Sequence, residues 1–349
     1  VRNIHFWSGN LLVIVCLLHL MRVFLSGALR GARRLNWIVG LVLFILVLFA
    51  NFSGYLLPWD QLAYWAVTMF TGMFGYIPLC GTWLMELVRG GREVGAPTLA
   101  NFYAIHVGVL PFLFLLFGVW HFWLVRRAGG LVEQDRGDGE RGVRVPVIPN
   151  LVSREVATGL GLCSVLLLFA ASVDAPLADP ANPAMSPNPA KAAWYFLGLQ
   201  ELLMHLHPVI VICMIPILSF AVLVAIPFRE AWLLPAGIWF GGKGGRVRFS
   251  AGLACGVVIT FFLVYADDWL IRASSSQPSA ADLWGRGVVP LLLFILFPVA
   301  LFQLLVRKYR LIPSAAALVL SGIVVGIVIS LTIIGIWLRG PGMHLVTLF

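Results

Sequence analysis

Charged side chains are scarce in this sequence. Asp, Glu, Lys and Arg together make up 11% of its 349 residues, whereas 60% are hydrophobic. Soluble domains carry about 25% charged residues, and no soluble fold could bury this much apolar surface. The composition therefore excludes a soluble protein and predicts an all-α, polytopic bundle of transmembrane helices.

Paired cysteine motifs are also missing. None of the five cysteines has a second cysteine three positions away, so the sequence offers neither a zinc-ribbon motif nor a c-type haem attachment motif. A cleavable signal pattern is absent too, because the first apolar stretch begins almost directly after Val1. Since the chain does not begin with Met, we expect natural residues upstream of Val1.

The net charge of the chain is +9, from 24 basic and 15 acidic residues. A basic protein can bind nucleic acid, but Lys and Arg also gather in the short cytoplasmic loops of membrane proteins and orient their helices. We assign the positive charge to this topological role. Membrane lipid, and not nucleic acid, is therefore the expected surrounding.

Long apolar runs predict eight membrane spans. Positive charges gather after the first, third, fifth and seventh spans, which places those loops on the cytoplasmic face (n-side). Loops 58–103, 174–206 and 272–286 then lie on the opposite face (p-side). A multi-pass protein of the bacterial inner membrane is expected. The predicted spans are 3–24, 36–57, 104–125, 155–173, 207–227, 250–271, 287–306 and 313–338.

A polar segment rich in glycine and charge divides the chain. We predict an N-terminal domain over 1–130, a linker over 131–152 and a C-terminal domain over 153–349. Within the C-terminal domain, the proline-rich stretch 174–193 cannot span the membrane. It leads into an aromatic run that starts at Trp194.

Four histidines lie in two of the spans. His5 and His19 are 14 residues apart, and His106 and His121 are 15 apart, or about 21 Å of helix, most of a bilayer core. Fifteen residues overshoot one helix face by about 60°, so the second pair requires a local distortion or a tilted helix. Both spans run from p-side to n-side, which brings His5 to His106 and His19 to His121. Because imidazole ligates haem iron, two bis-histidine haem sites are predicted.

Small and basic residues accompany both predicted haem sites. Gly40 and Gly54 in the second span are also 14 residues apart, and we expect them to give clearance to haem. Ordinary packing of small residues between helices is the alternative. Arg2 and Arg22 each lie three residues from a histidine, where they could pair with haem propionates or anchor the span end.

Several motifs of residues 1–130 resemble the cytochrome b of cytochrome bc complexes. The Asp of the Leu-Pro-Trp-Asp-Gln run and the 15-residue histidine spacing are closer to the photosynthetic b/f type. The motifs are Arg2-Asn3-Ile4-His5, His19-Leu20-Met21-Arg22, Gly54-Tyr55-Leu56-Leu57-Pro58-Trp59-Asp60-Gln61, Tyr64-Trp65-Ala66 and Ile77-Pro78.

A weaker resemblance covers about 150–230. The run from Asn188 to Phe196 is similar to the start of the quinol-site segment in the family's C-terminal half, which is a separate subunit (subunit IV) in the b/f type. Here both halves share one chain. The last three spans, 250–338, are placed by analogy with the extra C-terminal helices of fused forms.

The resemblance implies a function, cofactors and partners. Such a subunit of a quinol:cytochrome c oxidoreductase binds two b-type haems and quinol or quinone. It oxidises quinol at a p-side pocket, passing one electron to a Rieske iron–sulfur protein and then to a c-type cytochrome. The other electron crosses the membrane to an n-side quinone, coupled to proton translocation. Members of the family form homodimeric, multi-subunit complexes.

The resemblance also assigns roles to individual residues. The two histidine pairs would be the axial ligands of a low-potential p-side haem and a high-potential n-side haem. The p-side pocket would be built from Tyr55, the 58–80 loop, Trp194 and Tyr195. Arg126 matches a family position near the n-side quinone pocket, although a topology-determining charge is the alternative.

The sequence departs from the family where a quinol proton is expected to be accepted. The family usually carries an acidic residue before Trp-Tyr, whereas Ala192 and Ala193 stand there in this chain. We expect Glu201 to substitute, because burial would raise its pKa into a useful range; a helix-end hydrogen bond is the alternative. His205 and His207 are further candidates.

A second departure concerns the four-helix haem bundle of the family. That bundle has one more span upstream of the His5 helix, which we expect either in upstream residues or from a partner. The b/f type also attaches an additional haem covalently in that region. The sequence neither predicts nor excludes this additional haem.

Two other classes of membrane protein remain open. One is a di-haem membrane anchor of another quinone-linked complex, such as a hydrogenase or formate dehydrogenase, but such anchors are usually shorter and lack the Leu-Pro-Trp-Asp-Gln loop. The other is a transporter that uses membrane histidines as proton relays. No internal repeat or broken-helix pattern in the sequence supports a transporter.

Overall fold

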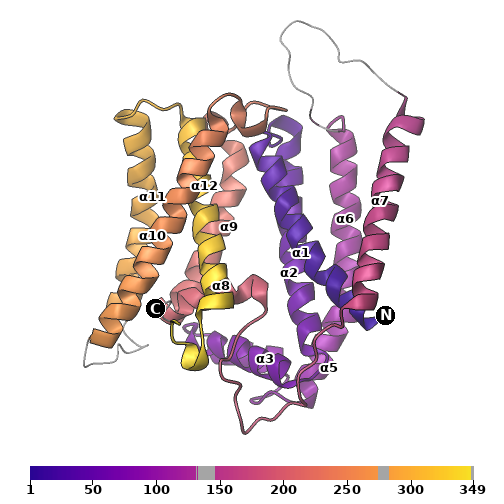
Figure 1. Cartoon of the computed structure of the whole chain (residues 1–349), viewed down its shortest axis with the longest axis vertical. Coiled ribbons are helices and arrows are strands. Elements are labelled where there is room, and N and C mark those ends of the chain that lie inside the picture. Colours follow the sequence, from indigo (N-terminus) through magenta and orange to yellow (C-terminus); the bar gives the residue numbers. More distant parts are fainter. Residues whose placement is uncertain (131, 133–145, 274–282, 347–349) are drawn as a thin grey trace, which may run out of the picture.

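The computed structural model describes residues 1–130, 132, 146–273 and 283–346. These residues form helices joined by loops, without a strand, and eight of their helical segments are long and apolar enough to cross a membrane. The spans stand side by side as a broad bundle (Figure 1). The all-α class and the eight predicted spans are confirmed.

The spans of the N-terminal half are long and apolar and carry few charges, as helices that cross a membrane require. The third span extends further toward the p-side than predicted, since α5 continues through a π-helical turn into α6. The elements are α1 (Arg2–Leu25), α2 (Arg34–Leu56), α5 (Ala96–Ala104), the turn Ile105–Val109, α6 (Leu110–Arg127) and α7 (Val147–Ser172).

Shorter helices lie at the p-side end of the bundle, the lower end in Figure 1. Asp60 starts the first of them by accepting a 2.8 Å hydrogen bond from the backbone N–H of Ala63. The other carboxylate oxygen of Asp60 accepts from the N–H of Ala178, which ties the proline-rich stretch to this helix. The helices are α3 (Gln61–Met73), α4 (Gly81–Arg89) and α8 (Trp194–His205).

The described residues of the C-terminal half contain four spans after α7, and α10 and α12 approach each other closely. A Cβ atom built on Gly256 would lie 2.3 Å from the carbonyl oxygen of Ile323, and one on Gly326 would lie 2.4 Å from that of Leu253. Glycine therefore allows these two backbones to touch. The helices are α9 (Ile215–Ala225), α10 (Gly245–Ala273), α11 (Val289–Arg307) and α12 (Pro313–Ile333); π-helical turns Ile210–Met214, Trp284–Val288 and Ile334–Leu338 adjoin α9, α11 and α12.

Arginines join three of the predicted n-side loops to one another. Arg33 donates to the carbonyl oxygen of Gly130 at 2.6 Å, and Arg34 pairs with Glu230 at 2.5 Å. These contacts connect the loops after the first, third and fifth spans. The alternation predicted from the charges is therefore confirmed in the sense that these three loops share one face of the bundle.

The predicted linker, residues 131–152, overlaps the start of α7. Residues 131 and 133–145 of the predicted linker lie outside the described residues. α7 begins at Val147, eight residues before the predicted fourth span, and the division of the chain into two domains stays a prediction. This helix packs on α1, where the indole N–H of Trp7 donates to the carbonyl oxygen of Val173 at 3.0 Å.

Candidate functional site

The four histidines of the spans form two facing pairs. The ring centres of His5 and His106 are 6.0 Å apart, and those of His19 and His121 are 6.3 Å apart. Two imidazoles bonded at about 2 Å to opposite sides of one metal ion have ring centres about 6 Å apart. Each pair therefore fits the spacing of a bis-histidine haem iron.

A wide turn brings His106 to its partner. His106 lies in the π-helical turn Ile105–Val109, between α5 and α6. A π-helical turn contains an extra residue, which absorbs the overshoot of a 15-residue spacing. The local distortion predicted from the spacing of His106 and His121 is thus confirmed.

A buried serine orients the imidazole of His106. The hydroxyl of Ser53 lies 3.0 Å from Nδ1 of His106 and 3.2 Å from the carbonyl oxygen of Ala50. We assign the hydroxyl proton to the Ala50 carbonyl, so that Nδ1–H of the imidazole donates to the serine oxygen. Nε2 then keeps its lone pair for a metal, the arrangement usual for metal-binding histidines.

Gly40 and Gly54 lie against imidazole rings. A Cβ atom on Gly54 would be 2.7 Å from Cε1 of His106, closer than real Cβ atoms approach, whereas one on Gly40 would be 3.4 Å from Cε1 of His121. Both glycines of α2 therefore face the predicted ligands at matching depths. Their predicted contact with haem itself stays a prediction.

The arginines predicted to meet cofactors have different surroundings. Arg2 donates to the carbonyl oxygens of Ala175 and Pro176, at 2.6 and 3.3 Å. Arg22 and Arg126 are exposed near the n-side ends of α1 and α6. Arg2 therefore fastens the p-side end of α1, and the predicted propionate and quinone contacts of all three stay predictions.

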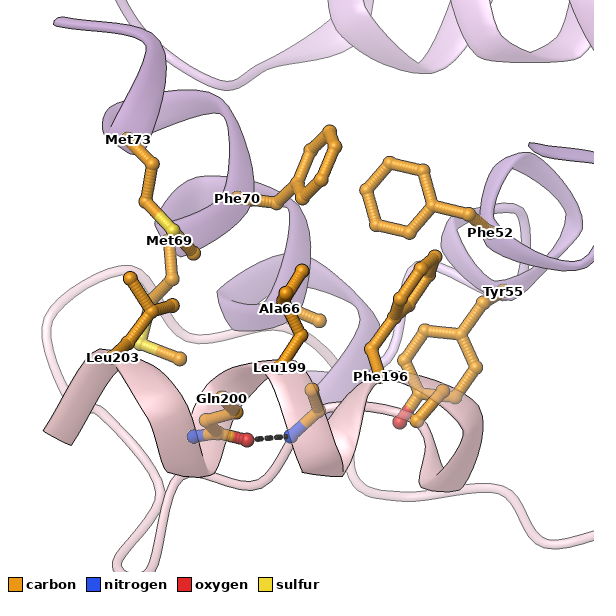
Figure 2. A pocket seen from close by; sticks show the side chains of 12 residues that line it. Phe52, Tyr55, Ala66, Met69, Phe70, Met73, Phe196, Leu199, Gln200 and Leu203 are labelled. Carbon is orange, nitrogen blue, oxygen red and sulfur yellow. Dashed lines mark hydrogen bonds between the residues drawn. The ribbon is translucent and has the colours of Figure 1, made fainter. Parts of the chain in front are cut away.

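A small cavity lies on the p-side between α2, α3 and α8. Its volume is about 50 Å³, enough for a few water molecules. Figure 2 shows Phe52, Phe70 and Phe196 facing one another across it, with Met73 at the far end. Among the described side chains that line it there is no acid and no histidine. The lining residues are Phe52, Tyr55, Ala66, Met69, Phe70, Met73, Ala192, Ala193, Phe196, Leu199, Gln200 and Leu203.

The aromatic residues predicted for the pocket have different positions. Tyr55 lines the cavity (Figure 2). Trp194 follows the lining residue Ala193 and is not itself in the lining. Its indole N–H donates to the side-chain oxygen of Asn10 on α1, at 2.6 Å. Burial, with the nearby Tyr55, raises the pKa of Tyr195 above its ordinary value, so its hydroxyl stays protonated.

Glu201 corrects an expectation from the sequence. Its side chain is fully buried, but it faces Arg339 and His205 and is not among the residues of the cavity lining. Burial favours a higher pKa, yet the hydrogen bonds from His205 and Arg339 outweigh it and hold the pKa of Glu201 below its ordinary value. The expected upward shift was wrong, and Glu201 is an ion-paired carboxylate.

The other two candidates for accepting a proton also lie away from the cavity lining. Nδ1 of His205 lies 2.6 Å from a carboxylate oxygen of Asp267, and Nε2 lies 3.2 Å from Glu201. Although burial opposes it, these two bonds raise the pKa of His205. His207 accepts a hydrogen bond from the N–H of Val209 and packs edge-on against Tyr76.

The sequence reasoning missed Arg339. It follows the eighth span on the predicted p-side, where the charge rule disfavours arginine. A basic residue on that face at the end of an apolar span was therefore a signal for a specific acidic partner. The partner, Glu201, lies 138 positions earlier, so no local pattern could identify it.

Comparison with known proteins assigns the family. The family model described as cytochrome b (N-terminal)/b6/petB matches residues 10–191, just over half of the 349-residue chain. The chain belongs to the cytochrome b family. Its resemblance to that family is thus confirmed, and it is a multi-pass membrane protein of a haem-binding family.

Cytochrome b6 proteins are among its similar relatives. The protein of Prochlorococcus marinus (strain MIT 9303) is 40% identical over 129 residues, which are 37% of this chain and 59% of the relative. That of Acaryochloris marina (strain MBIC 11017) is 43% identical over 129 residues, 37% of this chain and 60% of the relative. This chain thus spans about three fifths of the length of these relatives.

A solved structure extends the likeness of fold to nearly the whole chain. A chain of a hyperthermophilic respiratory Complex III superposes with a TM-score of 0.62 over 96% of this chain and 78% of its own length. Their sequences are 23% identical, so the likeness concerns the fold. It includes the C-terminal spans, which the family model does not reach.

Proposed function

We propose that this cytochrome b is the membrane subunit of a bc-type quinol:cytochrome c oxidoreductase. It oxidises quinol on the p-side and moves electrons toward a quinone on the n-side, with coupled proton translocation. The observation that carries the proposal is the two histidine pairs, each with ring centres about 6 Å apart, on α1 and the α5–α6 segment. Pairs at two depths suit transfer across the membrane better than a single site would.

The histidine pairs are the proposed haem-binding groups. His5 and His106 would hold one b-type haem near the p-face, and His19 and His121 a second near the n-face. When bound, each haem would supply one-electron redox chemistry at its own depth. Ser53 fixes the orientation of His106, which prepares Nε2 of that ring as a ligand.

The p-side cavity is the proposed quinol site. Its aromatic and aliphatic wall would exclude water and enclose a quinol ring, as apolar pockets do. Because the cavity holds only about 50 Å³, entry of a ring requires side chains to move, and the flexible Met69 and Met73 are suited to that. The Tyr55 hydroxyl is the proposed hydrogen-bonding group for the quinol.

The proposed partners are a Rieske iron–sulfur protein and a c-type cytochrome, within a homodimeric multi-subunit complex. What supports them is the fold shared with a chain of a respiratory Complex III, together with the family of the N-terminal half. The Rieske protein would receive electrons at the p-side, beside α3 and α8. The division at the linker into a haem domain and a quinol-site domain is part of the same proposal.

Replacing one ligand at a time tests this function. In His106→Leu the p-side b-type component should disappear from the reduced-minus-oxidised spectrum, and in His121→Leu the n-side component should disappear. Quinol oxidation should fall at least about a hundredfold in both, since binding of the redox group is lost. His344→Leu, outside the spans, serves as the control.

Unchanged spectra in the first two variants would refute the ligand assignment. Two haems without any quinol oxidation would favour an anchor of another complex.

A further inference from the structure

The C-terminal spans hold the segment that forms one wall of the cavity. The ammonium of Lys191 donates to the carbonyl oxygen of Ile336 at 2.8 Å, just before α8. A Cβ atom on Gly335, in the turn Ile334–Leu338, would lie 3.0 Å from Cβ of Leu197 in α8, so this turn and α8 are in close contact. Lys191 and Leu197 are thus both in contact with the turn that follows α12.

A buried ion pair forms the strongest of these attachments. Glu201 has no solvent exposure and Arg339 is 3% exposed. Nε of Arg339 lies 3.1 and 3.0 Å from the two carboxylate oxygens of Glu201, and Nη2 donates to one of them as well. This bidentate contact fixes the angle as well as the distance between the two side chains.

The ion pair continues into α10. His205 bonds Glu201 through Nε2 and Asp267 through Nδ1, and Arg339 also reaches Asp268 at 3.3 Å. Together the five charged groups connect α8, α10 and the end of α12. Every full charge buried here has a partner of opposite sign, as burial of charge requires.

The cluster and the cavity occupy roughly opposite faces of α8. Leu199, Gln200 and Leu203 line the cavity, whereas Glu201 and His205, one turn apart, face α10 and the end of α12. Any rotation of α8 about its axis that changes the second face also moves the first. A displacement of α8 at the cluster would therefore also displace the cavity wall.

We propose that Arg339, acting through Glu201, is a positioning residue for the quinol cavity, so that α10 and the segment after α12 hold the quinol site in its binding shape. This inference rests on the proposed function of the cavity. Removing Arg339 leaves the Glu201 carboxylate buried without its main partner, an arrangement that proteins relieve by movement or hydration. α8 then turns or shifts, and the wall formed by Leu199 and Leu203 no longer fits a quinol ring.

The test compares Arg339→Gln, Glu201→Gln and the double variant in the solubilised holocomplex. KM and kcat are measured with decylubiquinol and menaquinol-4 and normalised to b-type haem content. We expect KM to rise about tenfold in each single variant, equivalent to about 1.4 kcal/mol, while kcat per haem and both haem spectra change little. The double variant should recover most of the affinity, because neither partner then remains charged and unpaired.

A matched control and a milder variant complete the test. Glu86→Gln removes a p-side surface pair, 3.5 Å from Arg92, and should leave KM unchanged. If Arg339→Gln does not assemble, Asp267→Asn at the more exposed edge of the cluster should still raise KM about twofold.

Several results would overturn the inference. Wild-type KM in assembled Arg339→Gln, or in Asp267→Asn if the former does not assemble, would overturn it. So would an equal KM shift in the Glu86→Gln control. A smaller yield of protein with unchanged KM would make the cluster a stabiliser of the fold alone. If the wild-type complex oxidises neither quinol, the proposed function fails first and the inference with it.

Discussion

Single residues on α2 determine where the proposed ligands lie. The hydroxyl of Ser53 lies 3.0 Å from Nδ1 of His106, and Gly54 one position later leaves room for the same ring. A Cβ atom on Gly40, at the other depth, would only reach ordinary van der Waals contact with His121. The two glycines have the same spacing in the sequence as His5 and His19, but their local clearances differ.

This difference in clearance predicts unequal effects of alanine. In Gly54→Ala the new methyl group would meet His106 at 2.7 Å, so the ring must move. Overpacking of this kind costs about 1–3 kcal/mol, equivalent to roughly tenfold weaker haem binding at the p-side site. Gly40→Ala, at 3.4 Å, should change haem content little. Titration of the apoprotein with haem, followed by its absorption spectrum, measures both. Equal affinities in the two variants would contradict the argument.

Residue-level prediction from the sequence succeeded for features set by short-range periodicity. The pairing of the histidines and the need for a distorted turn near His106 followed from spacing alone. The environment of Glu201 did not follow, because its partner Arg339 is 138 positions away and only the packing of α8 on α12 brings them together. Burial does act to raise the pKa of Glu201, as expected from the sequence. The hydrogen bonds from His205 and Arg339, which the sequence could not show, lower that pKa more strongly.

At the scale of helices, hydropathy located the spans and missed the helices that lie on the p-side. α3, α4 and α8 contain 9 to 13 residues, too short to cross a bilayer, and they are bounded by loops rich in glycine or proline. α5 precedes the predicted third span and was counted as part of the loop before it. In the structure, α5 continues through the turn Ile105–Val109 into α6. Two of the p-side helices, α3 and α8, line the p-side cavity together with α2, so its exact lining could not be predicted.

The contact between α10 and α12 predicts a second difference between glycines. Gly256→Ala would place a methyl group 2.3 Å from the Ile323 carbonyl oxygen and force the helices apart. We expect a loss of about 1–3 kcal/mol in stability. Gly161→Ala on α7 has nothing within 4 Å and should be neutral or slightly stabilising. Thermal unfolding of the solubilised protein, monitored by circular dichroism, measures both midpoints. A loss of stability in Gly161→Ala equal to that in Gly256→Ala would refute the contact.

At the scale of the whole molecule, the charge pattern gives the bundle an orientation in the membrane. The arginine contacts of Arg30, Arg33 and Arg34 gather three positive loops on one face. The p-side helices gather on the other (Figure 1). The structure thus confirms that two distinct faces exist. Which face meets the cytoplasm stays a prediction from the charge rule.

Cys80 offers a direct test of orientation. Its side chain is exposed and precedes α4 on the predicted p-side, whereas the other four cysteines lie within spans. A membrane-impermeant maleimide should therefore label the protein in right-side-out spheroplasts, and Cys80→Ser should abolish the labelling. Labelling confined to inverted vesicles would reverse the orientation and exchange the two proposed haem sites.

The π-helical turn at Ile105–Val109 has a consequence for how such chains tolerate insertions. It accommodates one additional residue between two ligands without changing the direction in which His106 and His121 point. A spacing of 14 in regular helix and a spacing of 15 with one wide turn therefore serve the same geometry. Deleting one residue within this turn would restore an ordinary helix and keep both pairs in register. Loss of a single codon there, other than that of His106, is thus a change that preserves the geometry of both pairs.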